Sequence, residues 1–291
     1  MKSTQSLPEN THIGYTHLMV TDLERSLFFY QDILGFRIIE QEGLTVVLSA
    51  SGEPPAQMIL STMIGVLPRP PHTTGLYHVA IRLPDRQALS RVFRRALEHQ
   101  IPFHGAADHL VSEALYLPDP DDNGIELYVD RPRQEWPKLD GQIAMSTDPL
   151  DLQDLLNESE NDGKVWDGIA AGTDIGHVHL QVSNLERAEA FYSDLLGLDV
   201  TQRGYPGALF LSAGGYHHHL GLNIWTSRNA PPPPPEAVGL IAFKLNLPDE
   251  NARQILLQRI QDTGQIIEEY SPSSLISGAL IKDPDGIQII L

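Results

Sequence analysis

Two histidines and one glutamate occupy positions at which an internal repeat has kept a metal-ligating side chain in only one of its copies. The repeat pairs three such positions: Tyr15 with His177, His78 with Ala242, and Glu126 with Gln288. Imidazole nitrogens and a carboxylate oxygen are the ligand types of an open-sided site for a divalent transition metal. The inventory therefore predicts a single metal site that uses His78, His177 and Glu126.

The elements that must position these side chains follow from the same repeat. A segment with strand-like alternation, a helical segment and further strand-like segments recur in that order four times. These βαβββ modules are expected near residues 13–63, 75–130, 174–225 and 238–291. We expect Asp22 and Asn184 to cap the helices of the first and third modules, and those helices to end at Gly35 and Gly197.

Composition and charge limit the domain organisation and the partners. The chain has 291 residues, with 38 acidic against 20 basic residues, a net charge of −18 and no cysteine. This length allows two domains with buried cores, expected as halves at 1–130 and 174–291. The acidic linker between them, 131–173, contains "DPLDLQDLLNES" (148–159), which predicts one short helix with Pro149 at its first position.

The same composition argues against two classes of partner. Phosphate backbones and anionic membranes bind through clusters of Lys and Arg, so neither nucleic acid nor a membrane surface is an expected partner. The first residues lack an apolar signal-peptide segment, and no apolar run reaches membrane-spanning length. A cytoplasmic location is therefore the expectation.

Three segments carry a family resemblance. "HVHLQVSNLERAEAFYSDLLGL" (177–198), its copy at 15–36 and the ending "DPDDNGIELY" (119–128) resemble the vicinal oxygen chelate superfamily of glyoxalases and extradiol dioxygenases. With four modules and "GGYHHHLGLNIW" (214–225), the chain resembles the ring-cleaving catechol 2,3-dioxygenases in particular. The resemblance implies an α+β fold in which four βαβββ modules form two cupped sheets. It also implies a 2-His-1-carboxylate Fe(II) site, and Mn(II) accepts the same ligands.

In that superfamily two modules cup one metal, so the ligand positions indicate which modules meet. His78 and Glu126 belong to the second module and His177 to the third, and no other pairing supplies two histidines and a carboxylate at the family's positions. We therefore expect modules 2 and 3 to share the metal-binding cup, and modules 1 and 4 to form a degenerate one. His179 shares strand parity with His177, but His17 repeats it in the first module, which favours a structural role for both.

The resemblance also implies residues for proton transfer and substrate contact. His218 falls on the position of the family's acid/base histidine, and an imidazole with an ordinary pKa of about 6.5 suits that role. The alternative is that the three adjacent histidines form a solvated turn. If the stretch is extended, His217 and His219 point to the other face. Tyr116 lies ten residues before Glu126, a spacing that resembles the family's substrate-side tyrosine, although it also suits a half-buried strand tyrosine; His109 is a weaker candidate for the cup.

The function that these residues imply is extradiol cleavage of a catechol-type ring by dioxygen, so the expected partners are a small aromatic diol and dioxygen. One alternative is a glyoxalase-like metal-dependent isomerase or lyase. That chemistry usually needs a second acidic ligand from the partner module, and "HLGLNIW" (219–225) contains none. Another alternative is a metal-free ligand-binding protein of the resistance type. The sequence leaves the ring substituents and the oligomeric state open.

Overall fold

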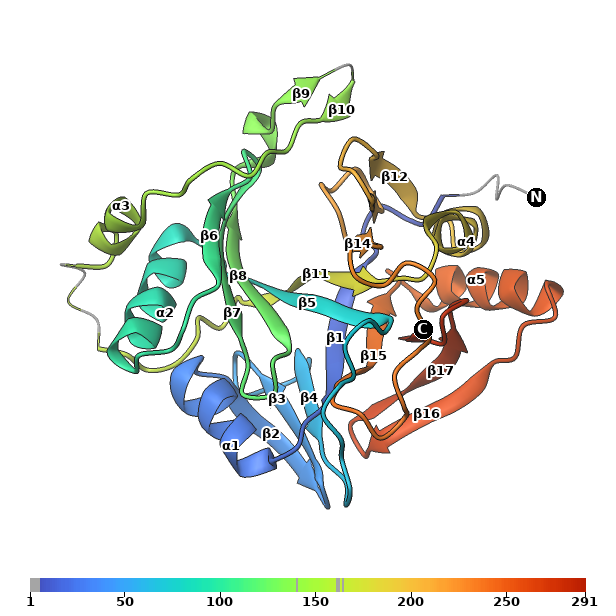
Figure 1. Ribbon diagram of the computed structural model, residues 1–291, viewed down its shortest axis with the longest axis horizontal. Helices are drawn as coiled ribbons and strands as arrows, with labels where there is room; N and C mark the ends of the chain where they lie inside the picture. Colours follow the sequence, from blue (N-terminus) through green and yellow to red (C-terminus); the bar gives the residue numbers. More distant parts are fainter. Residues whose placement is uncertain (1–5, 140, 161–162, 164) are drawn as a thin grey trace.

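The computed structural model describes residues 6–139, 141–160, 163 and 165–291, and these form the four expected βαβββ modules (Figure 1). The first comprises β1 (His12–Met19), α1 (Leu23–Leu27), the π-helical turn η1 (Phe28–Ile33), β2 (Arg37–Glu42), β3 (Thr45–Ser49) and β4 (Met58–Ser61). The second comprises β5 (Gly75–Arg82), α2 (Arg86–Glu98), β6 (Gly105–Asp108), β7 (Ser112–Pro118) and β8 (Gly124–Asp130).

The third and fourth modules repeat this order. The third comprises β11 (Asp174–Gln181), α4 (Leu185–Glu189), the π-helical turn η3 (Ala190–Leu195), β12 (Asp199–Gln202), β13 (Ala208–Ser212) and β14 (Leu220–Asn223). The fourth comprises β15 (Gly239–Asn246), α5 (Glu250–Asp262), β16 (Glu268–Ser273), β17 (Ile276–Lys282) and β18 (Gln288–Ile290).

The modules pair across the midpoint of the chain, as the ligand positions predict. One eight-stranded sheet has the order β12-β13-β14-β11-β5-β8-β7-β6, so it joins modules 3 and 2 through the antiparallel pair β11–β5. The other has the order β16-β17-β18-β15-β1-β4-β3-β2 and joins modules 4 and 1 through β15 and β1. Each sheet curls around a concave face, and the helices lie on the outer sides (Figure 1). The expected pairing of modules 2 and 3 is confirmed.

The local sequence explains the paired helices. Asp22 and Asn184 accept hydrogen bonds from backbone N–H groups three residues later, as expected of N-caps. Gly35 and Gly197 end the helical segments in the left-handed region, with φ of 88° and 94°. The widening of both helices to a π-helical turn is not predicted by the sequence pattern.

That turn carries a tyrosine that ties neighbouring modules together. The hydroxyl of Tyr30 donates to Asp119 at 3.0 Å, and Tyr192 donates to Asp283 at the same distance. Both aspartates begin an Asp-Pro-Asp turn that leads into the last strand of the next module. The tyrosine contacts therefore join modules 1 to 2 and 3 to 4, whereas the sheets join 2 to 3 and 4 to 1.

The linker does more than connect the halves. It contains the 3₁₀ turn η2 (Arg133–Glu135), the hairpin strands β9 (Lys138–Leu139) and β10 (Gln142–Ile143), and α3 (Leu152–Asn157). The short helix is confirmed but its predicted start is wrong. Asp151 is the N-cap and accepts from the N–H groups of Gln153 and Asp154, which leaves Pro149 outside the helix.

Within the described part of the chain, no helix is both long and apolar enough to cross a bilayer. Residues 1–5, on which the expected lack of a signal peptide partly rests, lie outside the described residues.

Candidate metal centre

The three candidate ligands converge on one point of the sheet that modules 2 and 3 share. The Nε2 atoms of His78 and His177 lie 2.9 and 3.1 Å from Oε2 of Glu126, and 3.3 Å from each other. All three side chains are buried, and among the described residues this is the group of histidine and acidic side chains whose ligand atoms gather closely enough for a metal ion. The structure therefore brings together the three residues that the sequence predicts as ligands.

The spacing of the three atoms fits a divalent cation. Ligands about 2.1 Å from an octahedral metal, on one face of its coordination sphere, lie about 3 Å from one another. Two imidazoles and one carboxylate also leave the opposite face open. The donor set and the separations of His78, His177 and Glu126 therefore fit the proposed group.

Strand register places the ligands. His78 lies on β5 and His177 on β11, the two central antiparallel strands, and Glu126 lies on β8, beside Ala80 of β5. A Cβ at Gly124 would lie 2.2 Å from the carbonyl oxygen of Tyr77, so glycine lets β8 approach β5 closely enough for Glu126 to reach both histidines.

The electrostatics of the cluster suit metal binding. Burial lowers the pKa of His177 to about 4, so the imidazole is neutral at pH 7 and carries a lone pair for a cation. Burial alone would raise the pKa of Glu126, but the adjacent His177 and His78 hold it well below its usual range. A carboxylate and a neutral imidazole are the protonation states in which Glu126 and His177 can bind a metal.

The corresponding fourth position contains no ligand. His78 and His177 occupy the same position in their strands, β5 and β11. Two residues later, Ala80 and His179 also occupy equivalent positions. Glu126 lies beside Ala80, and its counterpart beside His179 is Gly221 on β14. The ring of His179 covers this glycine, where a Cβ would lie 2.8 Å from the imidazole. His179 therefore fills the space in which a second acidic ligand would stand, and its burial fits the expected structural role.

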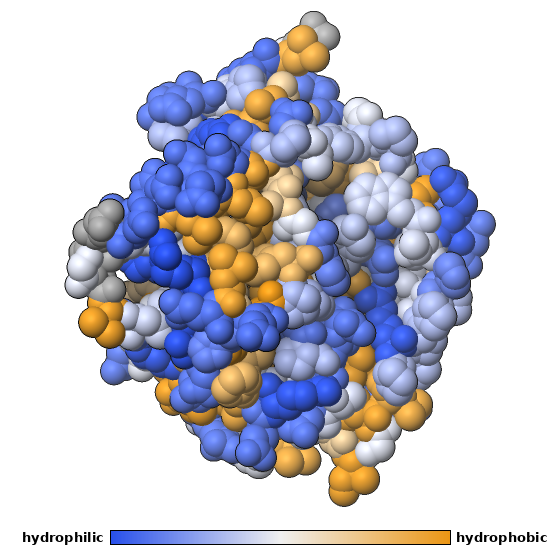
Figure 2. Space-filling model, turned by 60° about the vertical axis from the view of Figure 1, so that its left-hand side comes forward, coloured by the Kyte–Doolittle hydropathy of each residue, from blue (hydrophilic) through white to orange (hydrophobic). Residues whose placement is uncertain are grey.

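The cluster lies in a cavity of about 590 Å³ lined by side chains of both modules and of the linker. His218 lines it, with its ring centroid 4.1 Å from that of His177. Tyr116 also lines it, and its hydroxyl lies 2.6 Å from Nε2 of His109. Figure 2 shows one side of the molecule, where most of the surface is hydrophilic and apolar side chains gather in a band.

Burial sets the protonation of the cavity residues. It lowers the pKa of His218 well below 6.5, and the nearby histidines lower it further, so the ring is neutral. Burial and the Glu126 carboxylate raise the pKa of Tyr116 well above 10, so its phenol stays protonated and can donate a hydrogen bond. The structure thus brings His218, Tyr116 and His109 to the cavity of the candidate ligands.

The expected direction of His217 is wrong. Residues 214–219 form a turn followed by bends and irregular backbone, so strand alternation does not apply, and His217 lines the same cavity as His218. His219 lies outside the cavity lining, and its Nδ1 accepts from the N–H of Ala213. Met145 and Thr147 of the linker also line the cavity. No periodic signal marks them, because they belong to irregular backbone.

The predicted counterpart of Glu126 in the fourth module is also corrected. In both turns the aspartate Oδ1 accepts from the N–H four residues later, Asn123 after Asp119 and Ile287 after Asp283, so the turns have equal length. The pairing of Glu126 with Gln288 requires a shorter second turn. With turns of equal length, the counterpart of Glu126 is Ile290. Strand register agrees, because Leu280 faces Ile290 as Tyr116 faces Glu126.

The second sheet has an apolar cluster where the first has its ligands. Tyr15, the counterpart of His177, packs there with Ala242 and Ile290, the counterparts of His78 and Glu126. The remaining buried members are Val47, Ala56, Ile59, Tyr270, Ile276 and Leu280. The expected degenerate cup is therefore filled by side chains.

The fold is one of paired βαβββ modules, and among the described residues two histidines and one glutamate lie where they could hold a metal ion. Consistent with this, a model of the glyoxalase/bleomycin resistance protein/dioxygenase superfamily matches residues 12–127 and 174–291. The chain belongs to this superfamily.

Individual relatives narrow the comparison. The chain is 44% identical over 282 residues to catechol-2,3-dioxygenase of Bacillus subtilis (strain 168), which covers 96% of each sequence. It is 26% identical over 163 residues to biphenyl-2,3-diol 1,2-dioxygenase 3 of Rhodococcus globerulus, which covers 51% of this chain and 86% of the relative. Glyoxalase I from Zea mays shares the fold, with a TM-score of 0.56 and 17% identity over 97% of this chain and 92% of that one.

Proposed function

We propose that the protein is an extradiol dioxygenase that cleaves the ring of a catechol-type diol with dioxygen, next to one hydroxyl. The observation that carries this proposal is the convergence of His78, His177 and Glu126 within a cavity lined by both apolar and polar side chains. The 44% identity to a catechol-2,3-dioxygenase supports the same reaction class.

In this proposal His78, His177 and Glu126 hold Fe(II), with Mn(II) as the alternative metal. When bound, the metal would supply adjacent open positions that bring the diol and dioxygen together. The cavity walls orient the ring and limit the access of water, since Val111, Phe210 and Trp225 are among the lining residues.

Two side chains carry the polar roles. His218, neutral in the buried site, would accept the proton of a diol hydroxyl and later return it. Tyr116 on β7, which stays protonated, would form a hydrogen bond with a substrate oxygen. His109 faces the Tyr116 hydroxyl with Nε2 and the carbonyl oxygen of Ser146 with Nδ1, and these two contacts fix the direction of its ring.

Reconstitution tests the function directly. The purified protein is stripped of metal, loaded anaerobically with Fe(II) or Mn(II), mixed with catechol or a 3- or 4-substituted catechol, and exposed to oxygen. The expected result is the yellow ring-cleaved semialdehyde with equimolar oxygen uptake. If no diol is oxygenated while the methylglyoxal–glutathione adduct is isomerised, the dioxygenase proposal fails and a glyoxalase-like reaction replaces it.

A further inference from the structure

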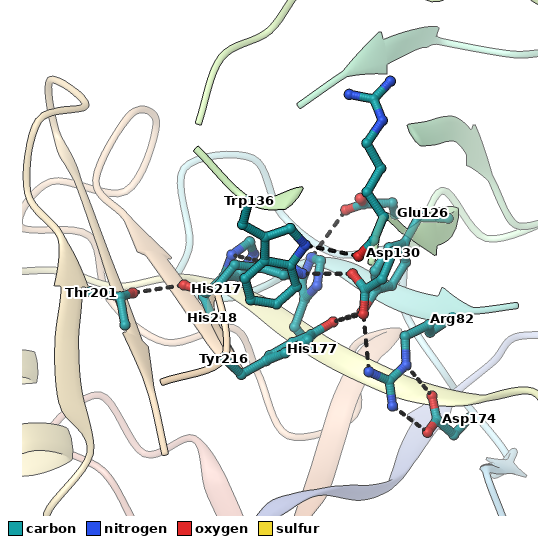
Figure 3. A network of polar contacts seen from close by, with 12 residues as sticks. Arg82, Glu126, Asp130, Trp136, Asp174, His177, Thr201, Tyr216, His217 and His218 are labelled. Atoms are coloured by element: carbon teal, nitrogen blue, oxygen red, sulfur yellow. Dashed lines mark hydrogen bonds and ion pairs between the residues drawn. The ribbon is translucent and has the colours of Figure 1, made fainter. Parts of the chain in front are cut away.

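A line of three polar side chains connects the end of β8 to the cavity. Oδ1 of Asp130 lies 3.0 Å from Nε2 of His217, and Nδ1 of His217 lies 2.9 Å from Nδ1 of His218 (Figure 3). The ring of His218 then lines the cavity beside His177. This line of hydrogen-bonded side chains therefore ends at His218, the residue that transfers a proton in the proposed function.

The first member of this line is held as a carboxylate. Besides His217, Asp130 accepts from the hydroxyl of Tyr216 at 2.8 Å and from the guanidinium of Arg82 at 3.1 Å. Arg82 is in turn paired with Asp174 at 2.7 Å, which fixes its direction (Figure 3). Burial alone would raise the pKa of Asp130, but His217, Arg82 and Tyr216 hold it below its usual range.

The second member is fixed in place by its surroundings. His217 is 1% exposed, and its ring packs near Trp136 of the linker, with the centroids 5.2 Å apart. Its backbone carbonyl accepts from Thr201 at 2.7 Å. The imidazole is therefore held so that each nitrogen faces one partner.

The protons along this line can then be assigned. A carboxylate only accepts, so the nitrogen of His217 that faces Asp130 must carry a proton. With a single proton on His217, held at the nitrogen that faces Asp130, its Nδ1 is an acceptor and the facing Nδ1 of His218 is the donor. The nitrogen of His218 that remains without a proton is Nε2, for which the described residues offer no hydrogen-bond partner.

We propose that Asp130 and His217 are positioning residues that set the tautomer of His218, so that its Nε2 is the proton acceptor presented to the substrate. This proposal rests on the proposed function of the same cavity. In the step that it serves, the O–H bond of the diol breaks and an N–H bond forms at Nε2. The electron pair stays on the diol oxygen, and His218 becomes an imidazolium whose Nδ1 proton remains hydrogen-bonded to His217.

The tautomers can be observed in the wild-type protein without turnover. Two-bond ¹H–¹⁵N spectra of ¹⁵N-histidine protein, metal-free and with the diamagnetic ion zinc, report which ring nitrogen carries the proton. Signals are assigned with His217→Asn and His218→Asn. We expect the Nε2–H form for His217 and the Nδ1–H form for His218. An Nε2–H form of His218 in the wild-type protein would overturn the proposal.

Asp130→Asn is the matched variant, because the amide has the same shape. Its single oxygen is drawn to the Arg82 donor, so its NH₂ group turns to His217 and both tautomers should reverse. With Fe(II) and catechol, kcat should fall about 10- to 100-fold, as loss of a supporting hydrogen-bond partner does, with KM changed less than about threefold. His219→Asn is the control, since this buried histidine lies outside the cavity and should retain the wild-type spectra and kcat.

The outcomes separate the two proposals. An unchanged kcat in folded Asp130→Asn, or a reversal of tautomers without a fall in kcat, contradicts the positioning role. Absence of turnover with every diol in the wild-type protein contradicts the proposed function instead. In that case the wild-type spectra still test the tautomer of His218, because they do not depend on turnover.

Discussion

The carboxylate of Glu126 lies between two imidazoles, and this arrangement concentrates three ligand atoms in a buried space. His78 and His177 are on the central strands, whereas Glu126 arrives from the parallel neighbour β8. Each of the three ligand atoms lies within 3.3 Å of the other two. Loss of any one would therefore leave only two ligand atoms for a metal ion. Residue identity at these positions should therefore affect metal binding far more than folding.

Glu126→Gln tests this expectation. The variant keeps the shape of the side chain but removes its charge. Loss of a group that only supports a ligand lowers metal affinity about 10- to 100-fold, and Fe(II) affinity should fall further than this in Glu126→Gln. Metal content after desalting and thermal unfolding are measured together. Gln288→Ala, in the second sheet, is the control and should bind metal as the wild-type protein does. Full metal content in folded Glu126→Gln would exclude Glu126 as a ligand.

His17 provides a pH test away from the metal centre. It lies in the second sheet, where its ring nitrogens face Tyr270 and Ser61, and burial lowers its pKa to about 3. In the unfolded chain the pKa is about 6.5, so the unfolded state binds the extra proton first and stability falls as pH drops from about 6.5 towards 3. At pH 4.5 this group alone should cost about 2 to 3 kcal/mol relative to pH 8.

Urea unfolding of wild-type protein and His17→Gln at pH 8, 6 and 4.5 measures this dependence. The variant should lose less stability between pH 8 and 4.5, whatever its stability at pH 8. An equal loss in both proteins would show that His17 titrates normally in the fold.

At the level of strands and turns, the repeat predicts the positions of His78 and His177 because regular strands keep alternation and register. The four module bounds follow for the same reason. Turns lack such a rule, which explains both corrections: Gln288 was misplaced by the assumed length of a turn, and His217 by an assumed strand. The linker residues Trp136 and Met145 were missed because irregular backbone gives no periodic signal of what it covers.

Gly176 shows how closely two such elements approach. A Cβ at this position of β11 would lie 1.6 Å from the hydroxyl oxygen of Tyr128 on β8, whose ring packs against His177. Gly176→Ala should therefore lower the free energy of unfolding by about 1 to 3 kcal/mol, as overpacking does. Tyr128→Phe removes the clashing oxygen, so Gly176→Ala should cost less in that background.

Denaturant unfolding of the single and double variants checks this coupling. Gly105→Ala is the control, because a Cβ at that strand position meets nothing within 4 Å. Equal costs of Gly176→Ala with and without the Tyr128 hydroxyl would contradict the clash.

At the level of the whole molecule, the modules form a closed ring of contacts. Sheets join modules 2 to 3 and 4 to 1, and the tyrosine–aspartate contacts join 1 to 2 and 3 to 4. The sequence repeat alone indicates four units, and only the distribution of ligand residues indicates that the central two must meet. The tyrosine contacts could not be predicted, because they depend on a π-helical turn.

Division of the chain tests this arrangement. Fragments 1–160 and 161–291 each contain one half, so the first carries His78 and Glu126 and the second carries His177. Neither fragment should retain Fe(II) after desalting, and mixing them should restore metal content and a single cooperative unfolding transition. Metal retention by fragment 1–160 alone would contradict a centre shared between modules 2 and 3.

The two central strand pairs are nested in the sequence. β1 pairs with β15, and both strands of the pair β5–β11 lie between them along the chain. During synthesis at about 5 to 20 residues per second, the inner strand would remain without its partner for several seconds, and the outer strand for roughly twice as long. The sheet that carries the ligands can close before the fourth module has left the ribosome. The sheet without candidate ligands closes last, after His78, Glu126 and His177 of the other sheet have already met.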